Sequence, residues 1–204
     1  MRKVFISYYH DDDQCYKNRL IQLNASFSMF ADNSVDIGDI DDEFLTDEQI
    51  RIKIRDDYIK DTDVFILLCG KNTKHRKHID WEIHAAMYKS AVKNPIPILV
   101  INLPGCRNGC RKNNNQEKTI IEKQTVLVWK SFSTAIEYIN CYPDLPKRLL
   151  DSLINKNTCV TIVNWDNLTT DDLKLLIELS YQRRWEYDYD DSSLLRRRNG
   201  ENEK

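Results

Sequence analysis

Three short apolar runs, separated by segments with helical patterning, constrain the fold of this 204-residue chain more than any other feature. The runs lie at residues 3–8, 63–68 and 96–101, and in each of them both sets of alternate positions are largely apolar. A strand with this pattern is buried on both faces, as the central strands of a parallel sheet are. The chain is therefore expected to form an α/β domain with helices on both sides of a parallel sheet.

Helical patterns fill the segments between these runs. One helix is expected to begin at Asp12 or Asp13, either of which could cap it, and to end near residue 29. A second helix begins at Thr46, which forms a capping box with Gln49. A third helix is expected at about 78–91, before the next apolar run.

This alternation is typical of a doubly wound, flavodoxin-like sheet with strand order 2-1-3-4-5. The second strand is expected at 34–37, followed by an acidic loop that contains Asp39, and the last strand of the main sheet at 126–129. In this topology the helices after strands 1 and 3 pack on opposite faces and leave a crevice at the carboxyl ends of those strands. A ligand site is therefore expected in the loops at 8–13 and 70–78.

The remainder of the chain has a different organisation. The expected segments are a long loop at 102–118, a short helix at 132–139, a strand at 159–165 and a helix at 169–184. We therefore divide the chain into a main domain (1–142), a C-terminal strand–helix extension packed on it (143–187) and a mobile charged tail (188–204).

The charge balance argues against two classes of partner. Thirty Lys and Arg against 32 Asp and Glu give a formal net charge of −2, so a nucleic-acid or membrane-surface partner is not expected. No apolar stretch approaches the roughly 20 residues that span a bilayer, and no signal-peptide pattern precedes the first strand. The protein is therefore expected to be cytoplasmic, with reduced cysteines.

The six cysteines include one pair at suggestive spacing. Cys106 and Cys110 form a C-x3-C sequence in the expected long loop, where a metal ion or a disulfide is conceivable. No second pair follows at zinc-site spacing, and the four histidines lie far away in sequence. Free thiols and no bound metal are therefore expected.

Glu82 lies at the margin of the buried face of the third expected helix. At 100° per residue it falls about 60° to one side of Ile79, which belongs to the inward stripe. The positive end of the helix favours a carboxylate there, and a half-buried acid at a crevice of this kind is a catalytic candidate. The alternative is a solvated glutamate that pairs with His78 or Lys89.

Other chemistries lack their motifs. The chain has neither a G-x-G-x-x-G nor a P-loop sequence, and it has no nucleophile elbow. A magnesium-dependent phosphoacceptor needs an acid at the end of strand 3, which reads Leu-Leu-Cys-Gly-Lys. Ser7 could hydrogen-bond a ribose, and Tyr8 or Tyr9 could stack on a base. The alternative for the two tyrosines is one ring in the core and one at the surface.

Three motifs lie in order along the main domain. They are Val4-Phe5-Ile6-Ser7-Tyr8 followed by His10 and Asp11, then Asp63-Val-Phe-Ile-Leu-Leu, and then Lys77-His78-Ile79-Asp80-Trp81-Glu82-Ile83. Over roughly residues 3–140 the chain resembles the TIR-like domains of bacterial anti-phage defence, in particular the ThsB-type proteins of Thoeris systems. The resemblance implies a flavodoxin-like fold and an enzyme that cleaves NAD. Such enzymes release nicotinamide and make a cyclic ADP-ribose isomer or a related ADP-ribose conjugate.

The resemblance also implies roles for particular residues. The catalytic glutamate of the family lies in a motif similar to Trp-Val-x-x-Glu-Ile, and the match places it on Glu82. His78 stands where the family often has a tryptophan, and the loop around Asp39 corresponds to one that often completes the site of a neighbouring protomer. The substrate-binding residues that the resemblance implies are Phe5, Ser7, Tyr8, Asp39 and His78.

The resemblance further implies partners. NAD is the substrate rather than a cofactor, the product activates a separate effector protein by diffusion, and self-association and a phage-derived trigger are expected. Because many TIR domains are adaptors, the alternative is a non-catalytic interaction module that only assembles with partners. Incubation with NAD distinguishes the two.

Overall fold

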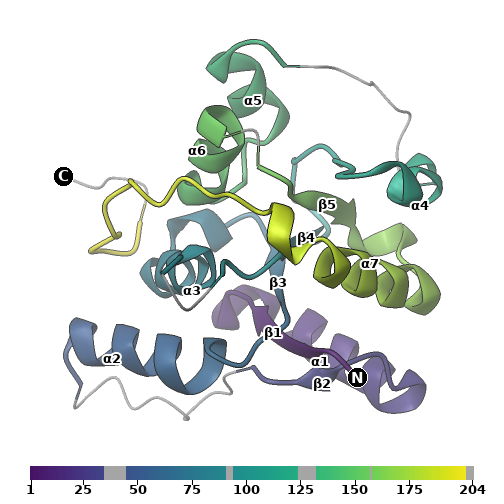
Figure 1. Ribbon diagram of the computed structural model, residues 1–204, viewed down its shortest axis with the longest axis horizontal. Coiled ribbons are helices and arrows are strands. Elements are labelled where there is room, and N and C mark those ends of the chain that lie inside the picture. Colours follow the sequence, from purple (N-terminus) through teal and green to yellow (C-terminus); the bar gives the residue numbers. More distant parts are fainter. Residues whose placement is uncertain (35–44, 91–93, 124–131, 157, 201–204) are drawn as a thin grey trace.

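The computed structural model describes residues 1–34, 45–90, 94–123, 132–156 and 158–200, and it contains a parallel five-stranded sheet with helices on both faces (Figure 1). The strand order is β2-β1-β3-β4-β5, as expected for a flavodoxin-like fold. The strands are β1 (Lys3–Ser7), β2 (Ala31–Asp32), β3 (Val64–Cys69), β4 (Ile98–Asn102) and β5 (Thr161–Asn164).

The helices connect the first four strands in the expected rhythm, whereas the helices Lys118–Glu122 and Lys147–Lys156 between β4 and β5 were not predicted. The helices are α1 (His10–Phe27), α2 (Asp47–Lys53), α3 (Lys77–Met87), α4 (Lys118–Glu122), α5 (Ala135–Cys141), α6 (Lys147–Lys156) and α7 (Thr170–Gln182), and a π-helical segment (Ile54–Ile59) continues α2. Thr46 and Gln49 form the expected capping box of α2. The first helix starts earlier than expected, with Tyr9 as its N-cap, because the acidic residues after His10 favour the positive end of the helix. Within the described residues, no helix is long and apolar enough to cross a bilayer.

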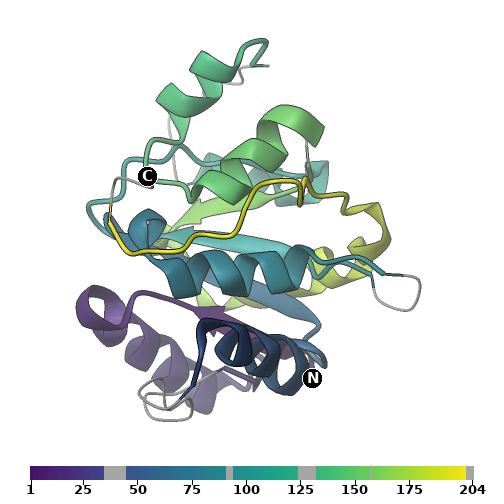
Figure 2. The same ribbon diagram turned by 90° about the vertical axis from the view of Figure 1, so that its left-hand side faces the viewer.

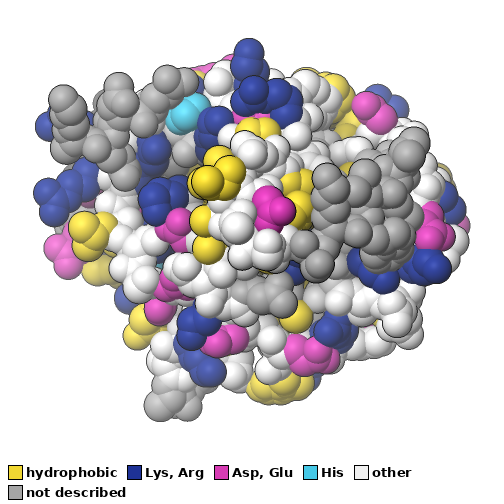
Figure 3. All heavy atoms as spheres, turned by 90° about the horizontal axis from the view of Figure 1, so that it is seen from above, with side chains coloured by type: hydrophobic (Ala, Val, Ile, Leu, Met, Phe, Trp, Pro, Cys, Tyr) yellow, Lys and Arg dark blue, Asp and Glu magenta, His cyan; other side chains and the backbone are white. Residues whose placement is uncertain are grey.

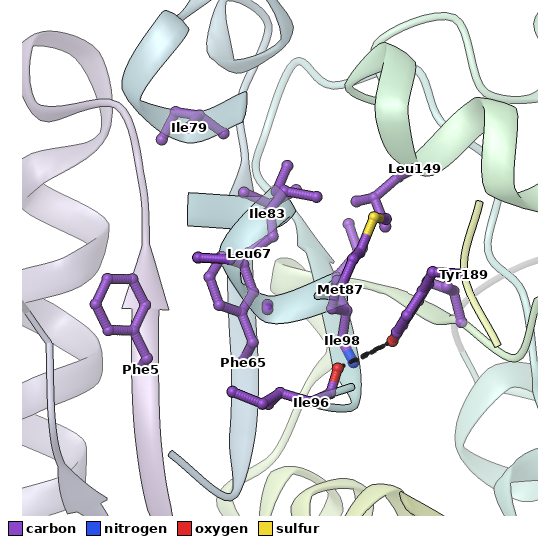
Figure 4. Packing of buried hydrophobic residues seen from close by; sticks show 14 of the residues in the cluster. Phe5, Phe65, Leu67, Ile79, Ile83, Met87, Ile96, Ile98, Leu149 and Tyr189 are labelled. Carbon is purple, nitrogen blue, oxygen red and sulfur yellow. Dashed lines mark hydrogen bonds between the residues drawn. The ribbon is translucent and has the colours of Figure 1, made fainter. Parts of the chain in front are cut away.

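Each face of the sheet carries its own hydrophobic core. Successive strand residues point to opposite faces, so Phe5 and Phe65 join the core under α2, α3 and α6 (Figure 4). Ile6 and Ile66 join the other core, under α1 and α7. Figure 2 looks onto the face that α2, α3 and α6 cover. Nearly continuous apolar strands follow directly from this two-sided burial.

The outer strands differ from the prediction. The second strand was expected at 34–37, but β2 is the pair Ala31–Asp32, which lies opposite Lys3 and Val4. Ser34 follows it and accepts a hydrogen bond from the Ile6 backbone N–H through its side chain, at 2.9 Å, so the ladder has already ended there.

The fifth strand of the described sheet comes from the expected C-terminal extension. The segment 126–129, predicted as the last strand of the main sheet, lies outside the described residues. β5 pairs with β4 instead, and its Ile162 and Val163 are fully buried. Residues 161–164 therefore belong to the main sheet, although they lie beyond the boundary that was expected near residue 142.

The tail is packed rather than extended into solvent. Residues 188–200 run across α3 and α6, in yellow in Figure 2, although a mobile tail was expected. The Tyr189 hydroxyl donates to the Ile96 carbonyl at 3.1 Å and accepts from the Ile98 backbone N–H at 3.0 Å (Figure 4). Trp81 Nε1 donates to the Arg196 carbonyl at 2.8 Å. These contacts are hydrogen bonds of tyrosine, tryptophan and backbone groups, so no apolar periodicity marks them in the sequence.

The surface agrees with the balanced composition. On the face seen in Figure 3, basic and acidic side chains of the described residues lie interspersed. The formal net charge of the whole chain is −2. Interspersed charges of both signs do not produce the extended positive electrostatic potential that attracts a polyanion such as nucleic acid.

Candidate active site

The carboxyl end of β1 meets α3 at the edge of the sheet where the crevice was expected. Ser7, the last residue of β1, is only 1% exposed, and Glu82 lies in the second turn of α3. The Ser7 hydroxyl donates to Glu82 Oε2 at 2.6 Å, although the two residues are 75 positions apart in sequence. The structure thus brings together two of the residues that were predicted for the site.

The packing of α3 explains why Glu82 faces this way. Ile79, Ile83 and Met87 point into the core beneath the helix, as Figure 4 shows, and all three are at most 3% exposed. Glu82 lies beside this stripe and is half-buried, as the helical pattern predicted. Trp81 is also buried, which the pattern did not predict, because the tail covers it.

Burial changes the acidity of Glu82. It raises the pKa of this carboxyl to about 7, and the hydrogen bond from Ser7 opposes the rise. A solvated glutamate, the alternative weighed above, would keep its ordinary pKa. Glu82 is therefore poised between the charged and the neutral form near neutral pH, which is typical of a catalytic acid.

Phe5 and Tyr8, predicted to bind substrate, lie in the two cores. The Phe5 ring is 1% exposed and stacks on Phe65 with 5.4 Å between ring centroids. Tyr8 is 4% exposed on the other face of the sheet, and its hydroxyl donates to Gln14 Oε1 at 2.7 Å. Neither ring opens to solvent in this structure. Tyr9 is partly exposed, so the alternative of one core and one surface tyrosine is correct.

The other two predicted substrate residues have different outcomes. His78 lies in the first turn of α3, with its ring centroid 5.1 Å from that of Trp81. It is partly exposed at the start of the helix that carries Glu82. Asp39 lies outside the described residues.

The loops after β1 and β3 contact each other through Tyr9 and through Arg76, which the sequence patterns did not single out. The Arg76 guanidinium lies over the Tyr9 ring, 3.6 Å from its centroid, immediately before α3. Its Nε atom is buried and makes no hydrogen bond within the part of the chain that the structure describes. This places a cation and the positive end of α3 at the same loop, an arrangement suited to an anionic ligand.

A second buried acid lies between the same loops. Asp13 is 6% exposed, and it accepts a hydrogen bond from the Thr73 hydroxyl at 3.3 Å. Burial raises the pKa of Asp13 to about 6. A Cβ atom on Gly70 would come within 2.5 Å of the Asp13 carboxylate, so glycine is what allows this close approach. Asp11 and Asp12, which precede Asp13, are also acidic but exposed, so the sequence alone does not show which of the three carboxylates is buried.

The cysteines and histidines do not gather into a metal site. Among the residues that the structure describes, no group of three or more His, Cys, Asp or Glu side chains is arranged to hold a metal ion. Cys106 and Cys110 are free thiols.

Fold and site together define a doubly wound α/β protein with a half-buried acid at the carboxyl end of its first strand. A family model described as the TIR-like domain of the Thoeris protein ThsB matches residues 5–108, which include both Ser7 and Glu82. The chain belongs to this family and is a TIR module of anti-phage defence. A comparison with curated proteins found no match.

Removal of the Ser7 hydroxyl tests the electrostatics of the pair. In a Ser7→Ala variant, the pKa of Glu82 is expected to rise above about 7, because the hydrogen bond that stabilises the charged carboxylate is lost. The measurement is a ¹³C NMR titration of labelled glutamate side chains, with the Glu82 signal assigned by its loss in Glu82→Gln. Ser26→Ala, at an exposed position on α1, is the control. An unchanged Glu82 titration in Ser7→Ala would contradict the assigned contact.

Proposed function

We propose that this protein cleaves NAD in the cytoplasm and releases nicotinamide, producing a cyclic ADP-ribose isomer or a related ADP-ribose signal that activates a separate effector protein. The observation that carries the proposal is the half-buried Glu82 carboxyl, held by Ser7 at the carboxyl end of β1, with its pKa raised to about 7. Membership of the ThsB TIR-like family supports it.

An acid in this position suits the bond that breaks. When the bond between nicotinamide and ribose breaks, its electron pair stays with the nicotinamide nitrogen, which leaves as a neutral molecule. Positive charge then develops on the ribose ring, and an ionised Glu82 beside the ring stabilises it, as carboxylates do in glycosidases. A nucleophilic atom of the same ADP-ribose unit attacks the ribose carbon and loses a proton, which closes the cyclic product. Neither a metal nor a redox cofactor takes part.

The surroundings of Glu82 suit the remainder of the substrate. Arg76 lies immediately before α3, so its guanidinium and the N-terminus of the helix would offer positive charge to the pyrophosphate. His78 lies at the same helix end and would contact the substrate there. A loop from a second copy of the chain, containing Asp39, would complete the site, so the active form is a self-associated one. A phage-derived component acts as the trigger.

The test is direct detection of products. Purified protein is incubated with NAD, with and without lysate of phage-infected cells, and the products are separated by chromatography and identified by mass and fragmentation spectra. We expect nicotinamide together with an ADP-ribose derivative, at least in the presence of infected lysate, and not with uninfected lysate alone. Intact NAD under every condition would favour the non-catalytic adaptor instead.

A further inference from the structure

Two thiols lie side by side at the carboxyl edge of the sheet. Cys69 is the last residue of β3 and is fully buried, whereas Cys106 lies in the loop after β4 and is partly exposed. Their sulfur atoms are 4.0 Å apart. We propose that this pair is an oxidative modification site, at which a hydroperoxide converts the two thiols into a disulfide.

The framework around the pair favours this reaction. A disulfide has an S–S distance of about 2.05 Å, so the sulfur atoms must approach by about 2 Å. Cys69 is fixed in the sheet, where it pairs with Asn102 of β4. On the other side, Cys106 follows the exposed Gly105, whose positive φ of 89° marks a turn. One sulfur is therefore rigidly held, and the other lies beside a solvent-exposed turn.

The residues after Cys106 keep the two sulfurs together. The Arg107 side chain donates to both carboxylate oxygens of the buried Asp144, at 2.7 and 2.9 Å. Asn108 accepts from the Asp144 backbone N–H at 2.8 Å, and its side-chain amide lies 3.5 Å from Cys69 Sγ. Because these contacts hold the loop against β3, disulfide formation does not depend on a chance encounter.

The environments assign different roles to the two thiols. The hydrogen bond with Cys69 lowers the pKa of Cys106, and the backbone N–H groups of Asn108 and Arg107 contribute to this. The hydrogen bond with Cys106 and burial raise the pKa of Cys69. Since the thiolate is the nucleophile, Cys106 attacks the oxidant and Cys69 resolves the product.

The chemistry balances with the hydroperoxide as oxidant. The Cys106 thiolate attacks the terminal peroxide oxygen, the O–O bond breaks, and the remaining oxygen leaves as an alcohol, or as water when the oxidant is hydrogen peroxide. This forms a sulfenic acid on Cys106. The Cys69 sulfur then attacks the Cys106 sulfur, an S–S bond forms, and the hydroxyl group leaves with the Cys69 proton as water. Two thiols are oxidised and one peroxide bond is reduced.

The experiment uses hydrogen peroxide as the probe and the full chain. Reduced protein receives one equivalent of peroxide, the remaining thiols are alkylated under denaturing conditions, and peptides are identified by mass spectrometry. The principal product is expected to be a peptide pair joined through Cys69 and Cys106, which dithiothreitol separates. In Cys69→Ala, a dimedone adduct of a sulfenic acid is expected on Cys106, and in Cys106→Ser, Cys69 is expected to remain reduced.

The most exposed thiol supplies the matched control. Cys15 lies on the surface of α1, and Cys15→Ser should form the disulfide at the wild-type rate. Oxidation of Cys15 before Cys106 would overturn the proposal, and so would a disulfide of Cys106 with Cys110. Circular dichroism of each variant before oxidation shows whether it is folded. The readout is independent of NAD cleavage, so neither proposal depends on the outcome of the other test.

Discussion

Exchange of Glu82 for glutamine is expected to lower nicotinamide release by at least roughly 100-fold, because the amide cannot supply the negative charge that stabilises the developing positive charge on ribose. Glutamine has nearly the same shape and can still accept the hydrogen bond that Ser7 donates to Glu82 Oε2 at 2.6 Å. The loss should therefore appear in kcat, with the fold unchanged. The measurement is nicotinamide release under the condition in which the wild-type protein is most active. Activity of Glu82→Gln close to that of wild type would remove Glu82 from the mechanism.

The same variant should be more stable than wild type above neutral pH. Burial raises the pKa of Glu82 to about 7 in the folded state, so the folded protein favours the protonated carboxyl. Its contribution to stability is complete below the unfolded pKa of about 4.3 and is lost as the pH rises toward 7. At about 1.36 kcal/mol per pKa unit, a pKa raised from about 4.3 to about 7 lowers the stability of the wild-type protein by at most about 4 kcal/mol at pH 8.

Urea denaturation at two pH values measures this effect. The free energy of unfolding of Glu82→Gln, relative to wild type, should increase between about pH 5 and about pH 8, where the wild-type carboxylate is charged in both states. Glu122→Gln, at an exposed position on α4, should show no such increase. A relative stability that stays the same across this pH range would mean that the Glu82 carboxyl is not perturbed by burial.

The activity of the wild-type protein should follow the same ionisation. If the charged carboxylate is the active form, kcat/KM for NAD rises with pH through about 7, because this parameter reports the pKa of the free enzyme. If kcat/KM does not change with pH across this range, ionisation of Glu82 does not control the reaction.

The central strands could be predicted because each of them is marked by an apolar run within its own sequence. β1, β3 and β4 are buried on both faces, and nearly every position in them is apolar. The outer strands depend on partners far away in sequence: β2 has only two residues, and β5 is recognised only when it lies beside β4. The strand propensity of a segment does not show which distant strand it pairs with.

The candidate site shows the same division. Helical periodicity predicted that Glu82 lies at the margin of the buried face of its helix, and the family resemblance assigned it as the catalytic residue. Ser7 was predicted because it ends an apolar strand at the expected crevice and because the resemblance implies that it binds substrate. Arg76 and Asp13 were not predicted as residues of the site, because the burial of a polar side chain is decided by contacts with other loops. Phe5 and Tyr8 were assigned to the substrate by resemblance, but the alternation of strand side chains directs them into the two cores.

Arg148 holds the tail, and its loss is expected to cause one of the largest decreases in stability of any single substitution in the chain. Arg148 is 1% exposed, and its guanidinium contacts both carboxylate oxygens of Asp80 at 2.9 and 3.0 Å. It also donates to the carbonyls of Ser193 and Leu194, at 2.9 and 3.0 Å. Arg148→Leu leaves these acceptors without their donor, which costs about 3–5 kcal/mol for a buried pair. Urea denaturation gives the value.

Three further variants separate the ion pair from the tail as a whole. Lys147→Ala removes the neighbouring charge, which is 74% exposed, and should change stability by at most about 1 kcal/mol. Replacing both Arg148 and Asp80 by leucine should cost less than the sum of the single changes, because neither charge is left alone. Deletion of residues 188–204 should also destabilise the protein, because it exposes Trp81 on the helix that carries Glu82. If Arg148→Leu and the deletion both unfold at the wild-type urea concentration, the packed tail contributes nothing to holding α3 in place.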